Sequence, residues 1–166
     1  MKLITSAILT GAQANIVFTS IPAAYDDLVL LLSLRSSADN AGGTLAFNTG
    51  GTYTRRRRLA LGNTSSIDSA TVDYQVNTSV STANVFSNGT IYIPNYIGST
   101  VKPYSSRSGN ENNAATASTS IIAGLWNQTA AITQITLTPG AGNFVSGSEV
   151  YLYGITRGSD GIVTVT

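Results

Sequence analysis

Short runs of strand-forming residues, bounded by Gly, Ser, Asn and Pro, recur along nearly the whole chain. The most apolar run, residues 27–36, is unbroken from Leu28 to Leu32 and could also be helical. Pro22 before it and Ser36-Ser37 after it leave little room for a helix, so a long central strand with both faces covered is favoured. The pattern predicts eight to ten strands and little or no helix. The candidate strands are residues 15–21, 27–36, 44–48, 53–61, about 71–80, 90–97, 119–127, 131–138, 149–155 and 161–166.

The composition indicates the same class. Thr, Ser and Asn contribute 22, 20 and 13 residues, one third of the 166, and there are 16 glycines. Thr favours strands, whereas Ser, Asn and Gly favour turns. Together with the regular spacing of the runs, this predicts an all-β protein, an antiparallel two-sheet sandwich of jelly-roll-like type. Neither an internal repeat nor a domain boundary is visible, so residues 1–166 are expected to form a single β-sandwich domain.

The first residues resemble a short signal peptide, with one basic residue, Lys2, before an apolar stretch and an A-x-A triplet at residues 12–14. Thr5 and Ser6 interrupt that stretch. We therefore interpret residues 1–14 as an extended arm or a first strand. No run approaches the roughly 18 apolar residues that cross a bilayer, so no membrane partner is expected.

Several chemistries are excluded by missing residue types. The chain has no Cys and no His, which excludes disulfides, thiol nucleophiles, His-based triads and ordinary zinc or haem sites. Of its eight carboxylates, Asp26 and Asp27 are adjacent and would point to opposite faces of a strand, so no facing pair for glycoside hydrolysis is evident. Asp39-Asn40 is too sparse for a calcium site. The sequence predicts a non-enzymatic protein without a cofactor or metal.

Two segments are expected to lie outside regular, central strands. Residues 98–118 are almost entirely polar and predict a long loop, either a functional excursion or a contact surface. Residues 90–97 alternate but contain Pro94, which predicts an edge strand or a bulged one.

The sharpest single feature is the run Arg55, Arg56, Arg57 and Arg58 within the predicted strand 53–61. On a strand, Arg55 and Arg57 would face one way and Arg56 and Arg58 the other. Because two arginines pointing into a core are costly, the run should lie at a sheet edge or rim, or where the inward face meets another subunit. It is either a solvated edge that blocks aggregation or a protein–protein contact. Nucleic-acid binding is not favoured, because neither a second basic cluster nor an aromatic platform accompanies it and the net charge is only +1.

Three tyrosines, Tyr92, Tyr96 and Tyr104, lie in or beside the predicted polar loop. Tyrosine next to Asn and Ser can stack on sugar rings, so the three form a candidate glycan-binding or interface patch. The alternative is that Tyr92 packs within a sheet and Tyr104 is an ordinary loop residue.

Four motifs in a fixed order resemble small virion structural proteins of tailed bacteriophages. They are FTSIPxxYxDLxL from Phe18, followed by Arg35-Ser36; IxNY from Ile93; WxxxAAITxI from Trp126; and NFxxGSxxYLYGI from Asn143. Together they span about residues 15–157, nearly the whole chain. The four-arginine run is not part of this pattern.

The resemblance implies a β-sandwich component of the virion, without an enzymatic role. Since the chain shows no fibre shaft and no coiled-coil heptads, the leading expectation is a capsid decoration (cement) protein. Such a protein would form a homotrimer at a symmetry axis and bind the major capsid protein and copies of itself, with residues 55–58 and 1–15 as grips. The alternative is a tail-fibre or receptor-binding tip that recognises host surface glycans. In both cases the protein would be made in the bacterial cytoplasm.

Overall fold

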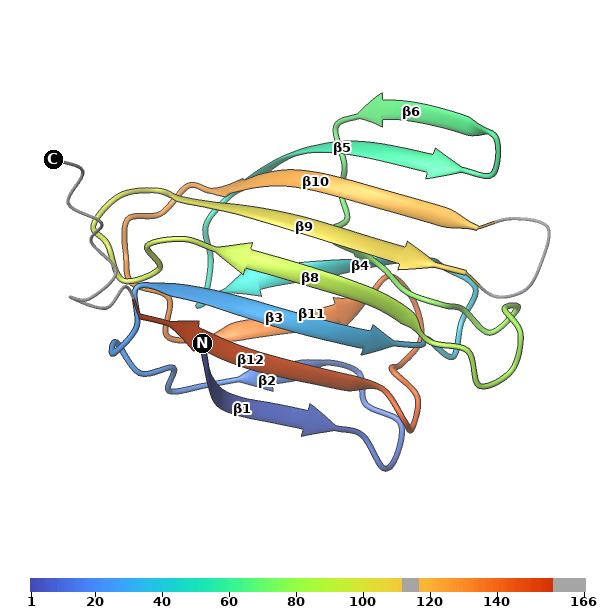
Figure 1. Cartoon of the computed structure of the whole chain (residues 1–166), viewed down its shortest axis with the longest axis horizontal. Coiled ribbons are helices and arrows are strands. Elements are labelled where there is room, and N and C mark those ends of the chain that lie inside the picture. Colours follow the sequence, from blue (N-terminus) through green and yellow to red (C-terminus); the bar gives the residue numbers. More distant parts are fainter. Residues whose placement is uncertain (112–116, 157–166) are drawn as a thin grey trace, which may run out of the picture.

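The computed structural model describes residues 1–111 and 117–156. These residues form twelve strands and no helix, arranged as two antiparallel sheets that face each other (Figure 1). The expected all-β two-sheet sandwich is confirmed. The eight-stranded sheet contains, in spatial order, β1 (Lys2–Ile8), β12 (Glu149–Ile155), β3 (Asp27–Leu34), β8 (Ser87–Ile93), β9 (Lys102–Asn110), β10 (Ser118–Trp126), β5 (Tyr53–Leu61) and β6 (Thr64–Asp68). The four-stranded sheet contains β2 (Ile16–Phe18), β11 (Ile135–Pro139), β4 (Gly42–Phe47) and β7 (Tyr74–Gln75).

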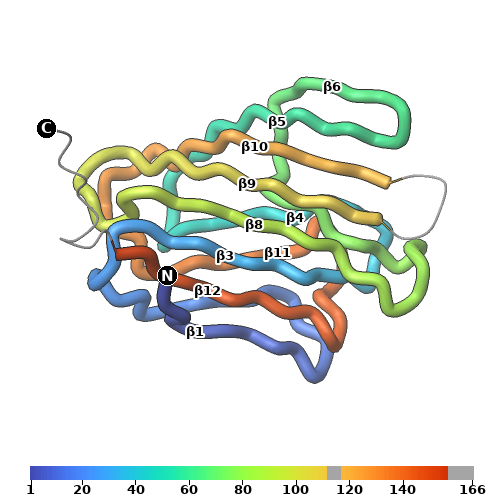
Figure 2. Tube along the Cα trace, in the orientation of Figure 1, coloured from blue at the N-terminus to red at the C-terminus, as the bar shows by residue number. Residues whose placement is uncertain are grey.

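The strand pairing is nested, as in a jelly roll. β3 pairs with β12 in the large sheet, β4 with β11 in the small sheet, and β5 with β10 in the large sheet again. The chain therefore wraps as one long antiparallel ribbon that alternates between the two layers. β1 lies at one edge of the large sheet, and the β5–β6 hairpin lies at the other (Figure 2).

The core lies between the two sheets and is built by alternate residues of each strand. β3 turns Leu28, Leu30, Leu32 and Leu34 inward, where all are buried. Burial of leucines on every second position is the period-2 signal of a half-buried strand. The opposite side of β3 is not covered, since Leu31 is 36% exposed. The expectation that residues 27–36 are covered on both faces was therefore wrong: the small sheet packs on one side only.

An aromatic cluster fills one end of the core. Trp126 contacts the ring of Phe47 edge-on, with centroids 5.7 Å apart, and Tyr104 contacts the same ring edge-on at 5.6 Å. Edge-to-face pairs of this kind add to the stabilisation that burial itself provides. This cluster anchors the start of β9 and the end of β10.

The expected long loop at residues 98–118 was wrong over the stretch Lys102–Asn110. Residues Lys102–Asn110 form β9, an interior strand between β8 and β10. Its inward residues include Ser106 and Ser108, both buried, so the strand has the burial pattern of a core strand without its apolar composition. Residues 90–97 were also misplaced. β8 ends at Ile93, before Pro94, and it lies between β3 and β9 rather than at an edge.

Other boundaries shifted for local reasons. The expected strand at about 71–80 shrinks to β7, and Val80 is 73% exposed. The first residues form β1, which pairs with β12, so the strand alternative for residues 1–14 is the one observed over Lys2–Ile8. The expected strand at 161–166 lies outside the described residues.

Candidate functional site

The outer face of the eight-stranded sheet is the largest surface that the fold leaves open. The strand register places one outward residue of each strand in a continuous row across the sheet: Ile67, Arg58, Ile121, Arg107, Thr90, Leu31, Tyr151 and Ser6. Ile67 is 78% exposed and Ile121 is 48% exposed. Ile121 lies within the sheet face and Ile67 lies on the edge strand β6, so apolar and basic side chains alternate along this end of the row.

The four-arginine run splits between the two faces of β5. Arg55 and Arg57 turn inward and are largely buried, whereas Arg56 and Arg58 turn outward and are exposed. The alternation expected from a strand is confirmed. β5 is the second strand from the edge, with β6 outside it.

The inward arginines are both neutralised. Arg55 forms a two-bond ion pair with Asp73, from Nε to Oδ1 at 2.6 Å and from Nη2 to Oδ2 at 2.9 Å. Arg57 pairs with Asp68 in the same way, at 3.1 and 2.6 Å. Hydrogen bonding to Arg57 lowers the pKa of Asp68. Such two-bond pairs are the strongest ion pairs that arginine makes with a carboxylate.

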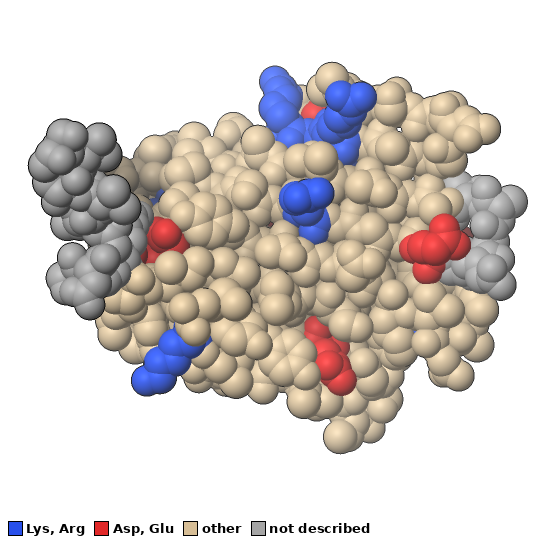
Figure 3. Space-filling model, viewed as in Figure 1, with Lys and Arg blue, Asp and Glu red and all other residues tan. Residues whose placement is uncertain are grey.

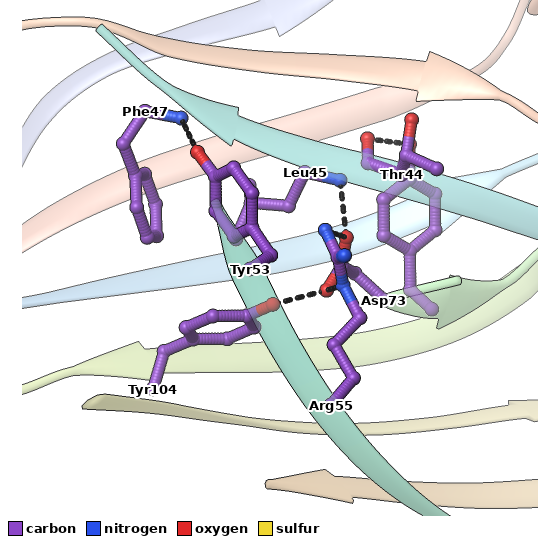
Figure 4. Close-up of polar contacts among 8 residues, drawn as sticks. Thr44, Leu45, Phe47, Tyr53, Arg55, Asp73 and Tyr104 are labelled. Atoms are coloured by element: carbon purple, nitrogen blue, oxygen red, sulfur yellow. Dashed lines mark hydrogen bonds and ion pairs between the residues drawn. The ribbon is translucent and has the colours of Figure 1, made fainter. Parts of the chain in front are cut away.

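Asp73 collects its partners from three directions between the sheets (Figure 4). Besides Arg55, it accepts hydrogen bonds from the Leu45 amide at 2.7 Å and from the Tyr104 hydroxyl. Burial, followed by the charge of Asp73, raises the pKa of Tyr104, so its hydroxyl remains a donor. The Arg55 guanidinium also lies over the Tyr53 ring, with its Cζ 4.6 Å from the ring centroid, in a cation–π contact. The Asp73 side chain is fully buried, so this is a structural cluster and not an accessible catalytic carboxylate.

A second buried cation lies on β9. Lys102 is fully buried and donates from Nζ to the backbone oxygens of Gly98, Thr100 and Thr129. Desolvation lowers the pKa of Lys102. The ammonium thereby fastens the turn before β9 to the segment after β10. It is a structural contact that the sequence did not suggest, because its acceptors are backbone atoms.

The outward arginines are joined by a third one from a distant part of the sequence. Arg58 and Arg107 lie opposite Ile121 on its two neighbouring strands, and Arg56 lies two residues from Arg58. We call Arg56, Arg58 and Arg107 the arginine cluster. Figure 3 shows Lys and Arg side chains gathered over this part of the face, with acidic atoms beside the uppermost of them and mostly uncharged surface below. Among the described residues, none of the three has an ion-pair partner.

Two shallow hollows flank the cluster. One, of about 580 Å³, lies beside Arg107 over β8, β9 and β10, and includes Asn88, Thr90 and Gly109. The other, of about 600 Å³, lies beside Arg56 and includes Ala123 and Pro103 on the outward side. Gly109 points outward, opposite Asn88, and its missing side chain contributes to the depth of the first hollow.

The three candidate tyrosines do not form a common patch. Tyr96 is buried and donates to the Pro22 carbonyl, and Tyr104 is buried against Asp73, so neither can stack on a sugar. Tyr92 alone reaches the outer face, 37% exposed, with its hydroxyl bonded to Asp27 at 2.9 Å. The outward tyrosines that accompany it are Tyr151 and Tyr153 of β12, which sequence reasoning missed. The alternation V-Y-L-Y at residues 150–153 could have identified them, since Val150 and Leu152 face the core.

Among residues 1–111 and 117–156, no group of three or more His, Cys, Asp or Glu side chains could hold a metal ion. In the same residues no helix is long and apolar enough to cross a membrane. The chain matches no protein-family model, no curated protein and no solved structure. The fold and the site together define a two-sheet β-sandwich with an open, arginine-bearing sheet face.

Proposed function

We propose that the protein is a non-enzymatic structural component of a bacteriophage particle, a decoration protein that binds the assembled head shell. The open outer face of the eight-stranded sheet carries this proposal. It presents Leu31, Ile121 and Ile67 to solvent on a flat surface, whereas an antiparallel sheet with one solvated face ordinarily alternates apolar-in and polar-out. The four phage-like motifs support the choice of a virion as the setting.

The mechanism is binding linked to assembly. A protein that binds the assembled shell, and not the separated subunits, stabilises the shell by mass action. In this proposal the partner is the major capsid protein, and three copies of the chain gather at a symmetry axis of the head. No chemical step is required, which agrees with a site built from arginines, aliphatic residues and shallow hollows.

The test is the copy number on purified particles of the phage that encodes the chain, measured by quantitative mass spectrometry against the major capsid protein. A ratio near one per capsid subunit supports a shell-covering decoration protein. Absence from the particle would overturn the proposal.

One observation favours a second candidate, a tail-fibre or receptor-binding tip that binds host surface glycans. Tyr92 is exposed on the same strand as Asn88 and Thr90, which line one of the two hollows. An aromatic ring beside hydroxyl and amide groups suits sugar binding. This function predicts only a few to a few tens of copies per particle, together with binding of host glycans by the isolated protein.

A further inference from the structure

We propose that the arginine cluster is the docking site for an acidic protein surface, whose carboxylates supply the ion-pair partners that Arg56, Arg58 and Arg107 lack within the described chain. The inference rests on the proposed function, because it names the chemistry of the partner that the open sheet face would bind. In the decoration protein proposed above, that partner is an acidic patch of the capsid protein.

The contrast within one strand is the first argument. Wherever β5 turns an arginine toward a carboxylate, as at Arg55 and Arg57, the fold forms a two-bond ion pair. The two outward arginines of the same strand have no such pair among the described residues. The fold thus contains the geometry for neutralising arginine and leaves the outward set free to do the same with a partner.

The second argument is the charge that gathers there. Side chains two residues apart on a strand are ~7 Å apart, and strands separated by one neighbour are ~10 Å apart. Arg56 and Arg58 therefore lie within a Debye length of each other, ~8 Å at physiological salt, and Arg107 lies just beyond it. Glu149 shares the outer face, three strands from Arg107 and ~14 Å away, and Glu111 lines the same hollow as Arg107. No ion pair among the described residues neutralises these three arginines, and an acidic partner would do so.

The third argument decides the class of partner. The charges surround Ile121, which is 48% exposed, and Ile67 lies beyond Arg58 in the same row. An apolar centre with arginine around it is the composition of protein–protein contacts. A nucleic-acid backbone would match the charges but would leave the isoleucines without contacts, and no aromatic ring lies in the cluster to stack on a base.

The experiment measures loading of the purified full-length protein onto heads prepared from a phage with the gene deleted. The double variant Arg58→Ser and Arg107→Ser removes two cluster charges at exposed positions, and the single variant Lys2→Ser removes a charge from β1 as a control. We expect the double variant to bind at least ~30-fold more weakly, the ratio that corresponds to loss of ~2 kcal/mol at a contact centre. Lys2→Ser should bind within twofold of the wild type.

A second variant keeps every charge and changes only the shape. Gly109→Val fills the hollow beside Arg107, and the backbone permits it, because an added Cβ would meet its nearest atom at 3.6 Å. We expect folding to be retained and loading to fall at least tenfold. Unchanged loading of both this variant and the double variant, with wild-type loading intact, would refute the docking site while leaving the proposed function in place.

Soluble competitors test the partner class independently of the head. Fluorescence anisotropy of the labelled protein is recorded with poly-L-glutamate and with duplex DNA at equal charge concentration. Tighter binding of poly-L-glutamate, lost in the double variant, supports the inference even where heads do not load, an outcome in which only the proposed function fails. Tighter binding of DNA, or binding that the double variant retains, would overturn it.

Discussion

The buried ion pair between Arg55 and Asp73 allows the sharpest test of how this fold tolerates arginine. Replacing Arg55 with Met keeps an unbranched side chain about as long as the Arg55 stem and removes the charge and its two hydrogen bonds to Asp73. The Asp73 carboxylate would then remain fully buried, with only the Leu45 amide and the Tyr104 hydroxyl as donors. Two neutral donors do not replace a guanidinium in a low-dielectric interior.

The expected loss follows from the burial of the pair. The Arg55 side chain is 13% exposed and that of Asp73 is 0% exposed, so water screens the pair little. Removing one member of a buried pair costs about 3–5 kcal/mol, because the other charge is left uncompensated. For a domain of this size, that corresponds to a fall in Tm of about 6–20 °C. It is a large fraction of the ~5–15 kcal/mol that stabilises a typical domain.

The chain provides its own probe for this measurement. Trp126 is the sole tryptophan, it is 1% exposed, and its ring contacts Phe47 within the same end of the core. Urea titration followed by Trp126 fluorescence gives the free energy of unfolding for the wild type and for each variant. Arg56→Met is the matched control, since it makes the same chemical change one residue away on the exposed face, and it should alter stability by no more than ~0.5 kcal/mol.

A double variant measures the interaction energy between Arg55 and Asp73 apart from their contacts with other residues. In Arg55→Met with Asp73→Leu, the loss should be at least ~2 kcal/mol smaller than the sum of the two single losses, because no charge is left buried alone. If Arg55→Met costs under ~1 kcal/mol, or if the two single losses simply add, then the buried pair is not what holds this part of the sandwich.

Three further predictions concern other sites. Lys102→Met should destabilise the protein by ~1–3 kcal/mol in urea titration, because three partly buried hydrogen bonds from a charged donor are lost. Gly51→Ala should cost more than ~2 kcal/mol by the same measurement, since Gly51 has φ +93° and a Cβ would lie 2.2 Å from Nε1 of Trp126. Arg57→Ser should return the pKa of Asp68 to its ordinary value, which carbon-13 NMR of the carboxyl group measures. In the wild type the lowered pKa of Asp68 stabilises the fold at pH values above the ordinary pKa, and this stabilisation is lost as the pH falls through the pKa of the folded state.

The strand period explains which parts of the site could be predicted. A strand turns alternate side chains to opposite faces, so the sequence alone separated Arg55 and Arg57 from Arg56 and Arg58. Which pair faces the core depends on residues from distant segments: Asp73, held by the Leu45 amide, supplies the inner-side carboxylate that pairs with Arg55. The addition of Arg107 to the cluster requires the strand order β9–β10–β5, a long-range pairing that no local pattern encodes.

The misplaced loop has a different cause. Residues Lys102–Asn110 alternate between buried and exposed as regularly as β3 does, but their inward positions are Lys102, Tyr104, Ser106 and Ser108. Sequence reasoning recognises strands by apolar residues at every second position, and only one of these four qualifies. Polar groups enter the interior here because neighbouring segments bind them: Ser108 accepts a hydrogen bond from the Gln75 amide, and Tyr104 donates to Asp73.

On β9 and β10 the usual pattern is reversed at the arginine cluster: inward residues are polar and an outward residue is apolar. Beneath the cluster, Ser106 and Ser120 are buried with hydroxyls that have no hydrogen-bond partner among the described residues, while Ile121 lies exposed above them. Each unpaired hydroxyl costs ~1–3 kcal/mol, and the exposed isoleucine forgoes part of the burial that a core position would provide. The buried side chain of Ile122 fixes the register of β10, so the strand cannot slip by one residue to correct the pattern. Places where a sequence departs from its folding rules are expected to be functional or strained sites. The exposed Ile121 and the unpaired arginines beside it are thus two independent departures at the same place, and a single acidic partner with an apolar centre would satisfy both.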